Sequence, residues 1–262
     1  MGMAPVKERI FVLMYKRLSE EAFMDGIARW NQMIKGRLSE KTPRTEWRTD
    51  IPTMPDGSPQ LEKISVACQI TRQYEAKAGT CRTLVQLRSD GIAFNLIGGG
   101  GDVGRFESLL SFATEYLSVW QQATGIQTYV NPFLHYVNVF SEDLIRPFQT
   151  ETAIFAGKMF RMFDNLPFKD APLSMPYRHE FSLSWRDRDP PAYLDVTFCM
   201  PKKRPVEVDL QIMARVSDSA QEMAGEICLA TIAPALHEYV LEVFQSILTI
   251  EVLTQCGVRY DR

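Results

Sequence analysis

VEVDLQIMARV, residues 206–216, alternates apolar and polar side chains from end to end, and YLDVTFCM, residues 193–200, does the same just before it. A period of two puts one set of side chains in a core and the other in water, which is the pattern of an antiparallel strand. Burying four aliphatic side chains on one such strand contributes roughly 6–12 kcal/mol before conformational entropy is counted. The second half of the chain therefore contains an antiparallel sheet with one wet face.

The same period recurs toward the N-terminus. Residues 64–71 alternate, and the strand-like run 82–97 is interrupted by Ser89-Asp90-Gly91. An Asp-Gly pair between two such runs predicts a hairpin, because glycine accepts the positive φ that the tight turn needs. Residues 9–15 and 129–140 are further β-favouring runs, whereas the polar, proline-containing stretch 43–59 predicts irregular structure.

Three stretches carry apolar residues at three- and four-residue steps, which predicts helices. The first begins after Ser19 and reaches Leu38, the second runs from Phe106 to a glycine at 125, and the last covers about 221–248. At 1.5 Å per residue the last helix is roughly 40 Å long, and its apolar face is wide enough to cover a sheet.

The order of these elements predicts an α+β fold. The strand at 9–15 and the strand at 129–140 lie about 120 residues apart, and the long helices keep a similar spacing. We therefore expect a duplicated β-α-βββ-α unit, with halves at residues 1–125 and 126–262, in which curved antiparallel sheets each pack on a long helix. The order leaves two arrangements open: sheets side by side, or one continuous sheet in one continuous domain.

Composition limits the class of protein. Of the 262 residues, 45% are hydrophobic and 23% are charged, and the formal net charge is −3, so disorder and a global attraction to nucleic acid or anionic lipid are excluded. Five widely spaced cysteines predict reduced thiols, and the first residues contain no signal peptide, so we expect a cytoplasmic protein. The apolar stretch 228–253 contains glutamates and a histidine, which argues against a membrane span.

One local motif has the form of an anion site. Gly99-x-Gly101-x-x-Gly104, followed by Arg105, lies between a strand and a helix, where backbone N–H groups and the helix dipole attract phosphate. A dinucleotide fold also needs a parallel βαβ unit and a carboxylate about 20 residues on, and both are missing here. We therefore interpret the glycines as a flexible loop, with a phosphate-bearing ligand at Gly98–Arg105 as the alternative.

Other catalytic and binding patterns are weak. His135, His179 and His237 stand on separate elements, and the sequence has no CxxC, HExxH or GxSxG motif, so we expect no metal, no cofactor and no catalytic residue. The basic tip Lys202–Arg204 is better explained as a solvated hairpin turn than as a nucleic-acid site, because no aromatic stacking platform accompanies it.

Several segments together resemble a sporadically distributed family of uncharacterised bacterial proteins of about this length. The resemblance lies in PVKERIFVLMY (5–15), VQLRSDGIAFNLI (85–97), RFESLLSFATEYLSVW (105–120), FLHYVNVF (133–140) and LHEYVLEVFQSILT (236–249). This chain has His135 where that family usually has an arginine. The resemblance implies no reaction, cofactor or substrate, and it implies a mobile-element or defence context.

The strand of residues 133–140 is the best candidate for a ligand site. Tyr136 and Asn138 share one strand face, His135 takes the other, and a buried Asn needs a hydrogen-bond partner. We expect any pocket to involve the concave sheet near His135, Tyr136, Asn138 and Trp120. The predicted function is that of a non-catalytic binding protein for a protein partner or an apolar small molecule, and a homodimer is open. An enzyme or sensor for a phosphate-bearing ligand is the alternative.

Overall fold

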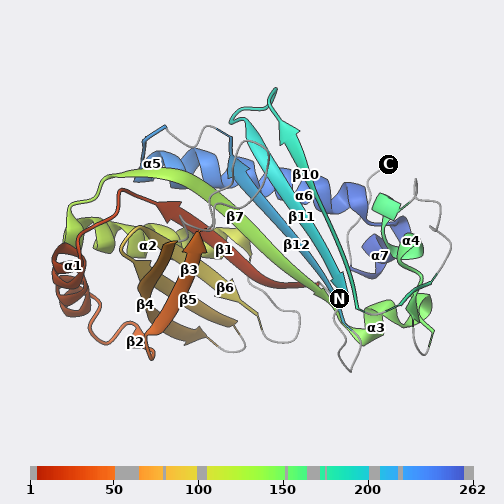
Figure 1. Ribbon diagram of the computed structural model, residues 1–262, viewed down its shortest axis with the longest axis horizontal. Helices are drawn as coiled ribbons and strands as arrows, with labels where there is room; N and C mark the ends of the chain where they lie inside the picture. Colours follow the sequence, from red (N-terminus) through yellow and green to blue (C-terminus); the bar gives the residue numbers. More distant parts are fainter. Residues whose placement is uncertain are drawn as a thin grey trace.

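The computed structural model describes residues 5–50, 65–78, 81–98, 105–150, 153–163, 172–174, 176–200, 207–217 and 221–256. Within these ranges the chain is an α+β protein with one large, twisted antiparallel sheet, and the long helices lie along one side of it (Figure 1). The α+β class expected from the sequence is confirmed.

The described part of the chain contributes eleven strands to the main sheet. They are β1 (Val6–Met14), β2 (Ser39–Glu40), β3 (Arg44–Asp50), β4 (Ser65–Ala78), β5 (Cys81–Arg88), β6 (Gly91–Ile97), β7 (Thr128–Phe140), β10 (Tyr177–Trp185), β11 (Ala192–Met200), β12 (Val208–Val216) and β13 (Met223–Ala224). Their order is β10-β11-β12-β7-β1-β6-β5-β4-β2, with β13 paired to β7 and β3 paired to β4. A separate pair joins β8 (Ala153–Ile154) to β9 (Leu173–Ser174).

The helices are two long rods and several short pieces. They are α1 (Glu20–Met33), α2 (Phe106–Thr124), α3 (Glu142–Ile145), the 3₁₀ turns η2 (Arg146–Phe148) and η3 (Arg161–Phe163), α4 (Ala156–Met159), α5 (Gly225–Ile227), the π turn η4 (Cys228–Ile232), α6 (Ala233–Ile247) and α7 (Ile250–Gln255). Because α5, η4 and α6 follow one another without a break, they form one rod, which we call the C-terminal helix.

The centre of the sheet rules out two separate sheets and leaves the continuous one. β1 pairs with β7 in antiparallel register, with Arg9 opposite Tyr136 and Phe11 opposite Leu134. β6 and β12 pair with the outer sides of these two strands. Backbone hydrogen bonds therefore join the strands before residue 125 to those after residue 126. Of the two arrangements left open by the sequence, the described chain has the single continuous sheet, not two sheets that each pack on their own helix. A strand has N–H and C=O groups on both edges that need hydrogen-bond partners. Here β1 and β7 satisfy each other's groups along the edge where the two halves of the chain meet.

One face of the sheet is sealed by helices. Phe11 and Leu13 of β1 and Leu210 and Ile212 of β12 have no exposed surface, and α2 and α6 pack on this side. The alternation in β11 and β12 is the one expected from the sequence, with buried and partly exposed residues in strict turn.

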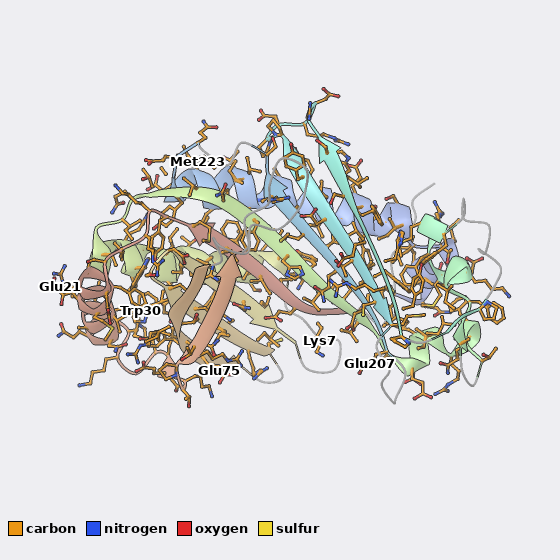
Figure 2. The ribbon with its side chains drawn as sticks, in the orientation of Figure 1. Lys7, Glu21, Trp30, Glu75, Glu207 and Met223 are labelled. Carbon is orange, nitrogen blue, oxygen red and sulfur yellow. The ribbon has the colours of Figure 1, made fainter. Side chains whose placement is uncertain are left out.

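An aromatic cluster fills the space under α1 and α2. The ring centroid of Trp30 lies 5.6 Å from that of Tyr74 and 5.9 Å from that of Trp120. Figure 2 shows Trp30 projecting from α1 toward the sheet. Ring pairs at these separations add to the stabilisation from burial alone.

Local signals set most element ends where the sequence predicted them. The Ser19 hydroxyl accepts a hydrogen bond from Ala22 N at 3.2 Å and caps α1, which ends at Met33 rather than near Leu38. Gly125 has φ +80° at the end of α2, in the left-handed region that glycine tolerates. β5 and β6 form the predicted Ser89–Gly91 hairpin. The stretch 44–50 was predicted to be irregular and is instead strand β3, because it pairs with the first half of the long strand β4.

Candidate functional site

Tyr136 and His237 meet at the seam between the two long helices. Tyr136 lies on the helix-covered face of β7, and its hydroxyl is 2.7 Å from His237 Nδ1 on α6. The Phe106 ring at the start of α2 stacks on the imidazole, with centroids 4.0 Å apart and planes 19° apart. The guanidinium of Arg9, which is paired with Tyr136 on the neighbouring strand β1, lies 5.2 Å from the Tyr136 ring centroid, a cation–π distance. We call these four residues the seam cluster.

The electrostatics keep the seam cluster in one protonation state. Burial and, to a smaller extent, the Arg9 guanidinium lower the pKa of His237 to about 4, and Glu107 acts in the opposite direction. Burial also raises the pKa of the Tyr136 hydroxyl. Near neutral pH both groups are therefore uncharged, and a single hydrogen bond joins the Tyr136 hydroxyl to His237 Nδ1. This pair ties the C-terminal helix to the centre of the sheet.

The other sequence-predicted ligand residues do not join Tyr136. His135 points to the opposite face of the sheet, where burial lowers the pKa of its imidazole and a side-chain hydrogen bond to Gln211 opposes that shift. Trp120 has no exposed surface and belongs to the aromatic cluster under α1 and α2. The structure therefore places His135, Tyr136 and Trp120 in three different environments.

Asn138 is buried two residues beyond Tyr136 on the same face. Its Nδ2 donates to the Leu210 carbonyl at 3.0 Å on the neighbouring strand β12. Its Oδ1 has no hydrogen-bond partner among the described residues. One half of the amide is thus satisfied by the adjoining part of the sheet, which is a structural role.

The predicted phosphate site falls mostly outside the described residues. Gly99, Gly101 and Gly104 lie there, as does the basic tip Lys202–Arg204. Arg105 is described, is exposed and precedes α2 without a side-chain cap. The Gly98 N–H, before the glycine run, donates to the Lys7 carbonyl at 3.0 Å.

A groove separates α2 from the start of the C-terminal helix. Its volume is about 720 Å³, and its floor is apolar, formed by Leu110, Leu117 and Leu229. Polar side chains make the rim, among them Ser111, Ser118, Gln121, Glu115 and Glu226. We call it the α2/α5 groove. An apolar floor with a few polar groups around it is the usual make-up of a binding site.

Gly225 sets how closely the two helices approach at the end of this groove. A Cβ on Gly225 would lie 2.7 Å from Gln121 Nε2 and 3.0 Å from Leu117 Cδ2, which is too close for either neighbour to remain in place. Glycine at 225 therefore lets the C-terminal helix begin directly against α2, and the groove opens from this contact.

The π turn η4 shapes the far wall of the groove. Pro234 has no N–H and cannot make the α-helical hydrogen bond to the residue four before it. The rod instead contains an i to i+5 bond, from Ala233 N to the Cys228 carbonyl. Such a turn widens the helix locally, and π turns are frequent at functional sites. Here it carries Leu229 and Ala230, which line the groove.

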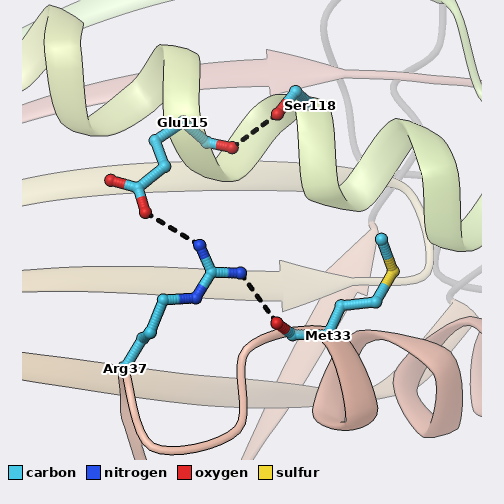
Figure 3. A network of polar contacts seen from close by, with 4 residues as sticks. All are labelled: Met33, Arg37, Glu115 and Ser118. Carbon is cyan, nitrogen blue, oxygen red and sulfur yellow. Dashed lines mark hydrogen bonds and ion pairs between the residues drawn. The ribbon is translucent and has the colours of Figure 1, made fainter.

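Among the described residues, the charged side chains that line the groove are two glutamates, Glu115 and Glu226. Residues 106–124 and 225–255 contain six glutamates and neither lysine nor arginine. Among the described residues, two of the six have cationic partners from other elements: Arg37 Nη1 lies 3.0 Å from Glu115 (Figure 3), and Arg188 Nη2 lies 2.8 Å from Glu242. Figure 3 also shows Ser118 donating to the Glu115 carbonyl, a contact that holds this part of the wall.

Part of the C-terminal helix stays apolar and uncovered. Ile227, beside Glu226, is 49% exposed. The rod Gly225–Ile247 is long and apolar enough to span a membrane, but 44% of its most apolar window is buried in the fold, and core helices meet the same criteria. It is therefore weak support for a membrane segment.

The sequence did not single out the partners that the fold brings together. His237, Arg9 and Phe106 join Tyr136 from three other elements, and Glu226 and Leu229 face α2 across the groove. The absence of lysine and arginine from both helices was the one readable signal. Among the described residues, no group of three His, Cys, Asp or Glu side chains could hold a metal ion. Comparisons of the chain with protein-family models, curated proteins and solved structures give no match.

Proposed function

We propose that this protein is a non-catalytic binding protein that receives its partner, a protein segment or an apolar small molecule, in the α2/α5 groove. The observation that carries the proposal is the groove itself, with an apolar floor and a polar rim in about 720 Å³. Binding sites for organic ligands are commonly concave and apolar in this size range, about 300–1,000 Å³.

The seam cluster supports a binding role over a catalytic one. A general base should have a pKa near the working pH. Burial lowers the pKa of His237 to about 4, and its Nδ1 is engaged by the Tyr136 hydroxyl at 2.7 Å. Phe106 covers the ring face. The imidazole is thus committed to holding α6 on the sheet.

We also propose that the scaffold is a duplicated β-α-βββ-α unit. Read outward from the central pair, the strands follow in the order β1-β6-β5-β4 on one side and β7-β12-β11-β10 on the other. In both sets the last strand along the chain lies next to the first and leads into a long helix, α2 or the C-terminal helix. The groove lies between these two helices, where such units meet.

A reducing compartment such as the cytoplasm suits the cysteines. Cys199, Cys228 and Cys256 are free thiols. Burial raises the pKa of both Cys228 and Cys256 to about 11, which makes these thiols poor nucleophiles.

A neutral fluorescent dye tests the binding proposal. Nile red should bind saturably, with a blue shift in emission, and Ala230→Trp should abolish this binding because the indole fills the groove that Ala230 lines. Ala28→Trp on the exposed face of α1 is the matched control and should leave dye binding intact. Absent dye binding, or dye binding that survives Ala230→Trp, would contradict the proposal.

The phosphate-bearing ligand at Gly98–Arg105 remains the second candidate, because Arg9 and the N-terminal turn of α2 lie beside the described ends of that loop. A thermal-shift screen with nucleotides tests it. A saturable stabilisation that is lost in Gly101→Val would favour an enzyme or sensor over the groove-binding protein.

A further inference from the structure

We infer that the occupant of the α2/α5 groove is a basic amphipathic α-helix of a partner protein. This inference rests on the proposed function and adds the chemistry of the partner. The groove is walled by two helices, and its floor of Leu110, Leu117 and Leu229 runs between them. A third helix laid along it would pack its apolar side chains on both walls, in the manner of helix-in-groove recognition.

The negative charge of the two helices indicates that the partner is positively charged. The two helices, α2 and the C-terminal helix, carry five glutamates and neither lysine nor arginine. Glu226 lines the groove, is exposed and has no ion pair with a described residue. Glu107 and Glu238, one from each helix, are both close enough to Tyr136 to raise the pKa of its hydroxyl. Acidic groups therefore stand at the start of the C-terminal helix and farther along the seam, and lysine or arginine on the flanks of a docked helix would face them.

The uncovered apolar surface gives this helix something to bury. Ile227 is 49% exposed beside the groove, and Ala230 within the groove is also exposed. An apolar centre with a charged rim matches the anatomy of protein interfaces, in which the centre supplies affinity and the rim supplies orientation. A small apolar molecule would contact the apolar floor but would offer no positive charge to the glutamates.

A membrane fits the same surface poorly. Helices that lie on bilayers carry lysine and arginine on their polar face, and the cytoplasmic leaflet is anionic. The glutamates of α2 and of the C-terminal helix would be repelled by that leaflet, and desolvating them in a bilayer is costly.

A second copy of the chain also fits poorly. In a twofold dimer the same patch meets itself, so the glutamates of one helix layer would face those of the other. Like charges brought together across an interface oppose association.

Two synthetic peptides test the inference. Each has about 18 residues, the length of five helical turns, with the same leucine stripe and either lysine or glutamate on the flanks. Fluorescence anisotropy with the full chain should show saturable binding of the lysine peptide that weakens with salt, and far weaker binding of the glutamate peptide. Ala230→Trp should abolish binding, and Ala28→Trp should not.

Charge variants test the electrostatic part of the inference and leave the apolar floor of the groove unchanged. Glu226→Gln combined with Glu238→Gln should weaken the lysine peptide roughly three- to tenfold at low salt, the range expected for two exposed ion pairs, and should reduce the salt dependence. Glu21→Gln is the matched control, since Glu21 is likewise a first-turn glutamate but lies on α1 (Figure 2).

The outcomes separate the inference from the proposed function. Nile red binding without a preference for the lysine peptide would overturn the basic helix and leave the groove-binding function standing. If the native chain binds neither the dye nor the lysine peptide, the function itself is overturned. Binding to vesicles of anionic lipid, or a dimer in sedimentation experiments, that disappears in Ala230→Trp would assign the groove to a membrane or to a second copy instead.

Discussion

The two sides of the sheet have the same strand order and are covered differently. On the side of β1, β6, β5 and β4, the fourth strand is covered by a helix: Tyr74 of β4 is 1% exposed and packs against Trp30 of α1. On the side of β7, β12, β11 and β10, the apolar row of the outer strand, Phe181, Leu183 and Trp185, is only half-buried. The same strand order therefore does not produce the same burial of the fourth strand. The difference comes from α1, which packs beside α2 and has no counterpart of its length between β7 and β10 in the described chain.

Matched truncations should show the largest difference between the two sides. Trp120→Ala leaves a cavity in a fully buried aromatic cluster and should cost about 3–5 kcal/mol in the free energy of unfolding. Phe181→Ala on β10 removes a half-buried ring and should cost about 1–2 kcal/mol. Urea unfolding followed by far-UV circular dichroism measures both. Equal losses would show that Phe181 on β10 is packed as well as the aromatic cluster under α1 and α2.

The two buried asparagines test polar contacts on either side. Asn95 of β6 donates to Glu8 Oε1 at 2.6 Å, whereas Asn138 of β7 donates to a backbone carbonyl. The Oδ1 of each has no hydrogen-bond partner among the described residues. Asn95→Leu should cost about 1.5–3 kcal/mol, because a hydrogen bond to a charged group is lost. Asn138→Leu should change stability by less than about 1 kcal/mol, since added apolar burial offsets the lost bond. Denaturant melts of the two variants give the comparison, and a larger loss for Asn138→Leu would reverse this ranking.

The pH dependence of stability reports on the seam cluster, which joins the C-terminal helix to the centre of the sheet. The pKa of His237 is about 4 in the folded protein and about 6.5 when unfolded, so the unfolded chain binds more protons between these values. Stability should therefore be full above about pH 6.5 and fall as the pH is lowered toward about 4, by about 1–2 kcal/mol after a discount for the partly exposed ring. His135, also with a lowered pKa, acts in the same direction.

The measurement is the melting temperature from pH 7 to pH 4 for the native chain, His237→Gln and the His135→Gln/His237→Gln pair. The acid-side slope should flatten in the first variant and flatten further in the second, although carboxylates keep some slope in all three. A slope that is the same in all three proteins would show that neither imidazole is held neutral by burial.

The sequence predicted the strands better than it predicted their neighbours. Period-two alternation located β11 and β12, and Asp90-Gly91 located the β5–β6 hairpin, because these signals are local. The pairing of β1 with β7 joins residues more than 100 positions apart, and nothing in either strand records it. The same limit explains β3, whose polar residues read as a loop and become a strand only through pairing with β4.

The site divides in the same way. Alternation correctly placed Tyr136 and Asn138 on one face and His135 on the other, because strand period alone decides this. It could not find His237, which stands 101 residues from Tyr136. The lack of lysine and arginine in residues 106–124 and 225–255 was visible in the sequence, but it gained meaning only when both helices proved to share one side of the sheet.

The smallest expected difference lies in the ion pairs that tether the two long helices at the surface. Arg37 reaches Glu115 of α2 through one carboxylate oxygen at 3.0 Å, whereas Arg188 reaches both oxygens of Glu242 on α6, at 2.8 and 3.0 Å, and lies 5.1 Å from the Trp185 ring centroid. Both pairs are about half exposed, so each should contribute only about 0.2–1 kcal/mol, with the Arg188 pair, in which one nitrogen contacts both carboxylate oxygens, at the upper end. Arg37→Gln and Arg188→Gln, melted in low and high salt, should differ little in high salt except for the cation–π contact, which salt screens less. Arg37→Gln should also leave Glu115, at the rim of the groove, without its cationic partner. The lysine peptide should therefore bind more tightly to Arg37→Gln and equally well to Arg188→Gln. This result would show that the negative charge of Glu115 contributes to binding of the basic helix.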